Sequence, residues 1–159
     1  GGGSGVAGVG DNRGRRRRAG ARIRTVAGGA AVPGPLGDGR PFDRILADVP
    51  CTASGIVRRH PDGKWLRRAA DVATFGAQQQ RLLAGVWPLL APGGRMLYAT
   101  CSLFPAEVQQ QIDAFLQRLG PDAARLDPAS PGHLLPLPDN ANASAATADG
   151  FHYALIHKP

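Results

Sequence analysis

Residues 42–51, FDRILADVPC, and residues 95–102, RMLYATCS, decide the fold of this chain. Each begins with a compact apolar run of strand length, and Pro50, which cannot extend a central strand, closes the first. We therefore predict a buried strand over 42–48 and a second apolar strand over 95–101.

Helices are predicted after each of these strands. Apolar residues recur at helical spacing from about residue 73 to residue 90, and the segment 92–94 (PGG) stops that helix. A proline opens the second helix at Pro105, and its apolar stripe consists of Val108, Ile112, Phe115, Leu116 and Leu119. The alternation predicts an α/β fold with a right-handed crossover, a parallel strand pair and helices that cover the sheet faces.

The remaining segments give weaker signals. Residues 151–158, FHYALIHK, alternate well enough for an edge strand that pairs antiparallel beside the second strand, and residues 22–27, RIRTVA, suit a short strand. Residues 49–64 read as a long functional loop and residues 128–149 as a loop.

Composition divides the chain at residue 40. Residues 1–39 hold thirteen of the 22 glycines and the basic run 15–18, so we expect this segment to be poorly ordered or degraded and the folded domain to span 40–159. Gly3, Gly5 and Gly8 match the spacing of a dinucleotide-binding loop, but the strand and helix that such a loop needs are missing around them.

The bulk properties limit the class of protein. No run of 18 apolar residues occurs and no secretory signal is visible, so we expect a soluble, cytoplasmic protein. The formal charge of +7 lies mostly in the first 40 residues, where it favours nucleic acid or anionic lipid without sequence preference. Because the only methionine is Met96, we expect a fragment of a longer protein.

Both cysteines fall where ligands bind in open α/β sheets, at the carboxyl ends of strands. Cys51 lies three residues after Asp48, and Cys101 closes the second strand. Neighbouring strands are about 4.8 Å apart, so the two thiols are expected to face one small reactant. Buried packing, a disulfide and a zinc pair are the alternatives. We expect no metal, because zinc needs about four ligands and no histidine stands at metal-ligand spacing from either cysteine.

The residues resemble one family over roughly 40–159. DVPCTASGIVRRHPDGKWLRR (48–68) and LAPGGRMLYATCSLFPAE (90–107) are similar to the two signature blocks of Sun-type (RsmB-like) RNA cytosine-5 methyltransferases, and FDRILAD (42–48) and DGFHYALIHK (149–158) fit the same family. Upstream, 9–12 and 24–31 look like degraded family sequence. The resemblance implies the C-terminal part of a Rossmann-like class I methyltransferase sheet, with parallel strands, a C-terminal antiparallel edge strand and the first strands missing.

The resemblance also implies a reaction and its residues. S-adenosylmethionine would be the methyl donor and RNA, most of all rRNA with a single-stranded or loop cytosine, the partner; the full-length protein would be a monomer. Cys101 would attack carbon 6 of cytosine, Cys51 would assist release of the product, and Asp48 would contact cofactor and base. An RNA-binding set would follow Cys51: Arg58, Arg59, His60, Lys64, Trp65, Arg67 and Arg68.

The sequence also departs from the family. The glycine-rich cofactor loop and the acidic residue for the ribose have no counterpart, and Gly29 stands where an aspartate near the adenine is common. A catalytically inactive RNA-binding fragment is therefore an alternative, and so is a thiol redox or cysteine hydrolase site, although neither a CxxC pair nor a histidine partner for Cys101 is visible. A truncated parallel sheet is also expected to expose an unpaired strand edge.

Overall fold

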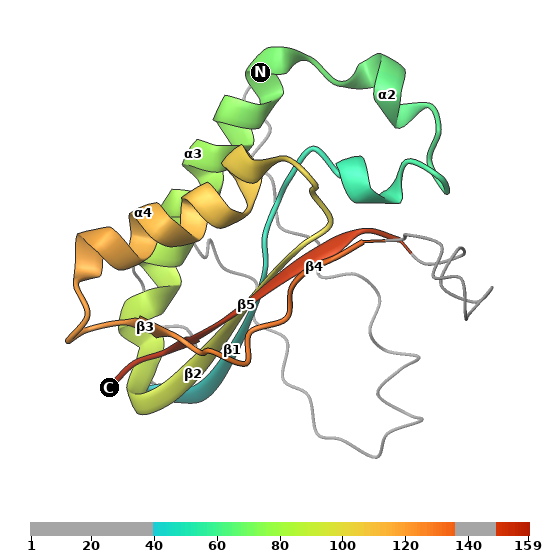
Figure 1. The fold of residues 1–159 in the computed structure, drawn as a ribbon. Coiled ribbons are helices and arrows are strands. Elements are labelled where there is room, and N and C mark those ends of the chain that lie inside the picture. Colours follow the sequence, from blue (N-terminus) through green and yellow to red (C-terminus); the bar gives the residue numbers. More distant parts are fainter. Residues whose placement is uncertain (1–39, 136–148) are drawn as a thin grey trace, which may run out of the picture.

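The computed structural model describes residues 40–135 and 149–159. These residues form a mixed sheet with two longer helices packed against it (Figure 1). The elements in chain order are β1 (Phe42–Asp48), η1 (Ser54–Ile56), α2 (Gly63–Leu66), α3 (Ala69–Val86), η2 (Trp87–Leu89), β2 (Leu90–Thr100), η3 (Pro105–Glu107), α4 (Gln109–Leu119), β3 (Arg125–Leu126), β4 (Gly132–Leu134) and β5 (Phe151–His157), where η marks a short 3₁₀ helix.

The predicted strand pairing is confirmed. β1 lies parallel to β2, with Asp48 opposite Ala99, and β2 lies antiparallel to β5. β2 starts at Leu90 instead of residue 95, because the predicted stop is part of the strand and shifts its register against β1. Within it, Gly93 has a φ of 74°, which favours glycine, and its N–H donates to the carbonyl of Lys158 at 2.8 Å.

The predicted helix between β1 and β2 forms, but it starts and ends earlier than expected. α3 begins at Ala69, four residues before the predicted start, where the Asp71 carboxylate accepts the backbone N–H of Arg68 at 2.8 Å. It ends at Val86, and a 3₁₀ turn containing Pro88 leads into β2. The crossover therefore returns the chain to a strand parallel to β1.

The second helix carries the predicted apolar stripe, but it is interrupted near its start. The 3₁₀ turn η3 stops at Glu107, since Val108 leaves the helical region of backbone angles, and α4 ends at Gly120, which has a φ of 81°. Ile112 and Phe115 are fully buried. They pack in one core with residues of α3, η2 and the strands: Ala47, Val49, Leu83, Val86, Trp87, Leu90, Met96, Tyr98, Ala124, Ala154 and Ile156.

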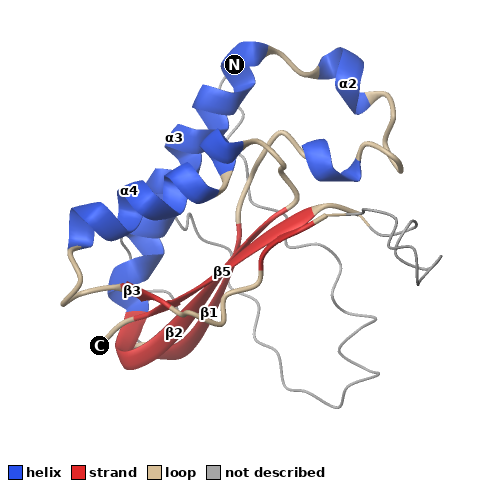
Figure 2. Ribbon diagram, in the orientation of Figure 1, coloured by secondary structure: helices blue, strands red, loops and turns tan. Residues whose placement is uncertain are grey.

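Two expectations about burial were wrong. In the part of the chain that the structure describes, α3 and α4 cover the same face of the sheet, so helices do not cover both faces (Figure 2). β1 is also not a buried strand. It pairs only with β2 among the described residues, and Leu46 on the uncovered face is 69% exposed. The predicted unpaired edge is therefore present in the described structure.

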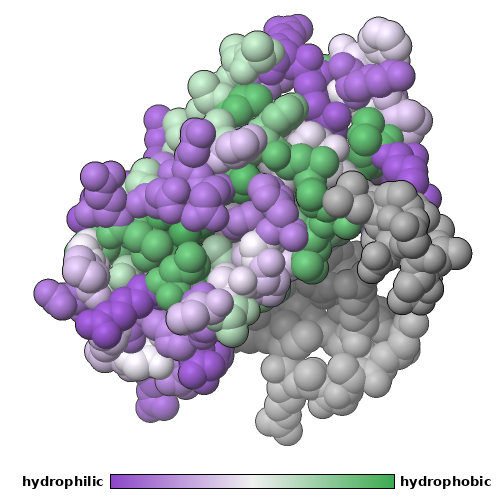
Figure 3. Space-filling model, viewed as in Figure 1, coloured by the Kyte–Doolittle hydropathy of each residue, from purple (hydrophilic) through white to green (hydrophobic). Residues whose placement is uncertain are grey.

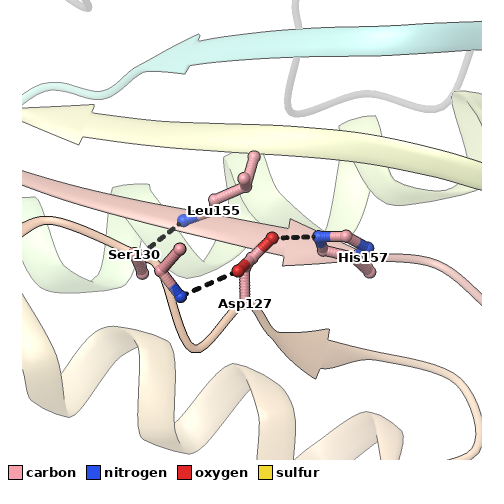
Figure 4. Close-up of polar contacts among 5 residues, drawn as sticks. Asp127, Ser130, Leu155 and His157 are labelled. Atoms are coloured by element: carbon pink, nitrogen blue, oxygen red, sulfur yellow. Dashed lines mark hydrogen bonds and ion pairs between the residues drawn. The ribbon is translucent and has the colours of Figure 1, made fainter.

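The C-terminal strand is internal and not at the edge of the sheet. β5 has β2 on one side and β3 and β4 on the other, and β4 lies in a segment that was expected to be loop. The turn between β3 and β4 is fastened to β5. The Asp127 carboxylate accepts the backbone N–H of Ala129 at 2.8 Å and contacts His157 Nε2 at 2.6 Å, and the Ser130 hydroxyl accepts the N–H of Leu155 at 2.8 Å (Figure 4).

Some predictions fall outside the described residues. These are the strand over 22–27, the glycine spacing at residues 3–8, and the segments 9–12 and 24–31, and the division at residue 40 stays a prediction. No described helix is both long enough and apolar enough to cross a membrane.

Candidate active site

The two cysteines lie together at the carboxyl ends of the parallel strands β1 and β2. Their sulfur atoms are 3.5 Å apart, and both side chains are partly exposed, so neither is a sealed core residue. Backbone bonds set this meeting: the N–H of Val49 donates to Ala99 O at 3.0 Å, and the N–H of Gly55 donates to Cys101 O at 2.7 Å. The geometric prediction that the two thiols face one another is confirmed, and the thiols are free in the described structure.

The two thiols differ in electrostatics. Contact with Cys101 is the largest cause of a lowered pKa of about 6 for Cys51, and it outweighs burial, which raises that pKa. The backbone N–H of Ala53 lies 3.3 Å from Cys51 Sγ and also lowers it. The same contact, together with burial, raises the pKa of Cys101. At neutral pH the pair therefore holds one proton, which resides on Cys101, and Cys51 is the thiolate.

The source of this activation differs from the one expected. An arginine-rich loop was expected to supply positive charge to the nucleophile. Instead, the Arg67 guanidinium donates to the backbone carbonyls of Thr52 and Ala53, so it fixes the loop after Cys51 and does not point at a sulfur. A thiol and a backbone amide supply the main hydrogen bonds that favour the thiolate.

Glu107 joins the two cysteine loops, and sequence reasoning gave it no role. Its side chain is fully buried. It accepts the backbone N–H of Thr52 at 2.9 Å, the Thr52 hydroxyl at 2.6 Å and the Ser102 hydroxyl at 2.5 Å. Glu107 ends the second signature block, but only the fold shows that its carboxylate reaches the residue after each cysteine.

Two further contacts that sequence reasoning missed support the same loops. Gln79 of α3 is fully buried and donates to Pro50 O at 2.8 Å. Gly55 lies so close to the start of β5 that an added Cβ would be 2.1 Å from the carbonyl oxygen of Gly150. A glycine is therefore required at position 55, and β5 bears directly on the loop that follows Cys51.

The predicted RNA-binding residues divide into two groups. Arg59 pairs with the buried Asp149, and Arg67 is used within the loop, so both have intramolecular partners. The other five are exposed on and around α2, beyond the carboxyl end of β1, where hydrophilic side chains cover the surface (Figures 1 and 3). They are Arg58, His60, Lys64, Trp65 and Arg68. Trp65 is 79% exposed, and Lys64 Nζ lies 4.9 Å from the centroid of its ring.

Asp48 is exposed at the end of β1, and its charge contributes to the raised pKa of Cys101, which places it on the side of the thiol pair. A carboxylate at this point can accept hydrogen bonds from an amino group of a small cofactor. Asp48 is the single described residue to which the resemblance gives a cofactor contact, so the described structure fits one end of S-adenosylmethionine and supplies no counterpart for its ribose and adenine. Within 40–135 and 149–159, no three histidine, cysteine or acidic residues are grouped as a metal site.

Comparison with known proteins places these features in context. The family model described as 16S rRNA methyltransferase RsmB/F matches residues 17–156, so the match includes the upstream segment 24–31. The chain is 46% identical to the ribosomal RNA small subunit methyltransferase B of Vibrio cholerae over 135 residues, which are 84% of this chain and 30% of that protein. It is 45% identical to the protein of that name from Salmonella arizonae over 143 residues, 89% of this chain and 32% of the relative.

Solved structures share the fold. A methyltransferase homologue from Pyrococcus horikoshii is 29% identical, with a TM-score of 0.54 over 76% of this chain and 40% of that one. NSun6 from Pyrococcus horikoshii, solved with the S-adenosylmethionine analogue SFG, is 22% identical, with a TM-score of 0.67 over 94% of this chain and 39% of that one. The mixed sheet is thus a Rossmann-like class I methyltransferase fold. The chain spans about a third of the length of the curated relatives it matches.

Proposed function

The chain belongs to the RsmB/F family of 16S rRNA methyltransferases, which use S-adenosylmethionine, and on that premise we propose that it carries the base-reactive part of an enzyme that methylates carbon 5 of a cytosine in rRNA. The observation that supports this best is the pair of thiols 3.5 Å apart at the ends of neighbouring parallel strands. Two sulfurs so placed can act on adjacent atoms of one pyrimidine ring. We place the reaction in the cytoplasm, where bacterial rRNA is made.

The first step uses the single proton of the pair. The Cys101 proton passes to the Cys51 thiolate across the 3.5 Å between the sulfurs, and the Cys101 sulfur bonds to carbon 6 of the cytosine. The electrons of the bond between carbons 5 and 6 move toward carbon 5, which becomes nucleophilic. Cys51 therefore serves as a base for attack, in addition to the part in product release that the resemblance gives it.

Release runs in the reverse sense. S-adenosylmethionine, when bound, supplies the methyl group to carbon 5. Cys51, whose pKa of about 6 favours the thiolate at neutral pH, loses its proton to water and then removes the proton from carbon 5. The double bond re-forms, the bond from Cys101 to carbon 6 breaks, and the pair again holds one proton. The whole cycle releases one proton to solvent.

Substrate binding is assigned to the exposed residues around α2. Attack on carbon 6 requires the base to leave any stack, which costs a few kcal/mol in a duplex and less in a loop, so we propose a single-stranded or loop cytosine. Lys64 and Arg68 offer positive charge and Trp65 a flat, 79% exposed surface for stacking. Arg59 and Arg67 contribute by holding the loops in place.

Formation of 5-methylcytidine tests this function. The 159-residue chain is incubated with 16S rRNA and S-adenosylmethionine, and the digested nucleosides are quantified by mass spectrometry. We expect 5-methylcytidine with the unaltered chain and none with C101A, while D113A, which alters an exposed carboxylate on α4, serves as the matched control. Product formation by C101A at the unaltered rate would refute the assignment of the nucleophile.

A second candidate function is favoured by the state of Asp48, which stands exposed as the one described cofactor residue. A chain that lacks a complete cofactor site would bind RNA without catalysis. Isothermal titration calorimetry separates the two candidates. Heat of binding with S-adenosylmethionine that D48N abolishes supports the enzyme, whereas RNA binding without any heat from S-adenosylmethionine supports the binding fragment.

A further inference from the structure

Glu107 occupies an unusual position for a carboxylate. It is fully buried, and burying a charged or polar side chain is costly unless hydrogen bonds replace the lost water. Three hydrogen bonds do so here, and all three donors belong to residues that directly follow a cysteine: two groups of Thr52 and the hydroxyl of Ser102. The same carboxylate therefore holds the loop after β1 and the loop after β2.

The element that carries Glu107 is firmly anchored. The Tyr98 hydroxyl of β2 donates to the backbone carbonyl of Glu107 at 2.7 Å, and the adjacent Val108 is fully buried. The α4 helix that follows contributes Ile112 and Phe115 to the core. The carboxylate is thus fixed to the packed core, while the residues it binds lie in loops outside the regular strands.

We propose that Glu107 is a positioning residue that holds the Cys51 and Cys101 loops together, so that the two thiols stay at the separation needed to act on one base. This inference rests on the proposed function for its importance to catalysis. It does not require Glu107 to touch the base. Thr52 and Ser102 transmit the constraint, since each is bonded to the carboxylate and covalently joined to a cysteine.

Substitutions at position 107 separate hydrogen bonding from charge. E107A removes all three bonds. E107Q keeps the shape and can keep three contacts, because its carbonyl oxygen accepts the Thr52 N–H and its amide group donates to the two hydroxyls, which turn to accept. D113A removes an exposed carboxylate six residues further on and is the control. Circular dichroism confirms that each variant is folded.

The first readout is the rate at which diamide closes a disulfide between Cys51 and Cys101 in the 159-residue chain, measured by mass spectrometry without RNA or cofactor. E107A should slow closure by roughly tenfold or more, since a misplacement of about 1 Å can cost reacting groups on the order of 100-fold. E107Q should restore most of the rate, and D113A should match the unaltered chain. A folded E107A that closes the disulfide at the unaltered rate overturns the inference.

The second readout is the rate of covalent adduct formation with RNA that contains 5-azacytidine. We expect the same order, with E107A slowest, and little change in the RNA concentration that gives half the maximal rate. If the unaltered chain forms no adduct, the proposed function fails while disulfide closure still tests Glu107. If E107A forms adduct as fast as the unaltered chain, the positioning role fails alone. Should E107A not fold, S102A, which removes one bond and keeps the charge, should slow closure by roughly threefold, and no slowing would contradict the role.

Discussion

Removal of Cys101 should make Cys51 a much weaker acid. In the intact pair the Cys51 pKa of about 6, against an ordinary value of 9.0, means that about 90% of this thiol is ionised at pH 7, compared with about 1% for an unperturbed one. The contact with Cys101 is the largest cause of that shift. C101A removes the contact, whereas C101S keeps a hydroxyl that can still donate to the thiolate.

The thiolate gain does not translate directly into rate. A thiolate of lower pKa is intrinsically less nucleophilic, with a Brønsted coefficient of about 0.4–0.5, so a roughly 90-fold gain in ionised fraction becomes a rate gain of about three- to sixfold at pH 7. The pH profile is therefore the sharper observable. Iodoacetamide labelling, quantified peptide by peptide, gives the pH at which the Cys51 rate is half its maximum.

We expect a Cys51 midpoint near pH 6 in the unaltered chain, a midpoint at least one unit higher in C101A, and a small shift in C101S. The direction follows from the loss of a donor that stabilises the charged form. A midpoint above pH 8 in the unaltered chain, or the same midpoint in C101A, would refute the conclusion that the two thiols share one proton.

Three further predictions concern RNA binding and stability. Because Arg59 and Arg67 have intramolecular partners, the slope of log affinity against log salt for single-stranded RNA should be no steeper than about −2, compared with about −3.5 for five phosphate contacts, and a slope near −3.5 in titrations would show that all five bind phosphate. Burial, first, and then His133 lower the pKa of His152 to about 4, so the unfolded chain binds a proton that the folded chain excludes, and stability should fall as pH drops from about 6.5 to about 4, by at most on the order of 3 kcal/mol; chemical denaturation of H152F should show less of this loss, and an equal loss would contradict it. The N–H of Ala129 and then His157 lower the pKa of Asp127, so its contribution is present above its unfolded pKa and is lost as pH falls through the lowered folded value; D127N should unfold more readily at neutral pH and gain less stability between pH 3 and pH 5, and identical acid profiles would count against this role.

The parts of the fold that depend on local pattern could be predicted from the sequence. The first strand was placed over its observed residues, and the stripe that contains Ile112 and Phe115 is the buried face of α4, because strand and helix periodicities are read directly from neighbouring residues. The meeting of Cys51 and Cys101 followed from one further rule, that parallel strands end at the same edge of the sheet.

The contacts that the sequence did not reveal join residues far apart in the chain. Nothing near Arg59 indicates its pairing with Asp149, and nothing near Glu107 indicates its bonds to Thr52. A charge run reads as a binding surface until a fold supplies partners for some of its members. The placement of β5 inside the sheet had the same cause, since β3 and β4 are too short to give a periodic signal.

Covalent trapping tests the central claim most directly. C51A is incubated with S-adenosylmethionine and RNA, and any protein–RNA adduct is digested and mapped by mass spectrometry. If two sulfurs act in turn on one cytosine, loss of the releasing thiol should leave the adduct in place, joined through Cys101, and C51A/C101A should form none. An adduct joined through any other residue, or its absence in C51A when the unaltered chain methylates the same RNA, would contradict the account.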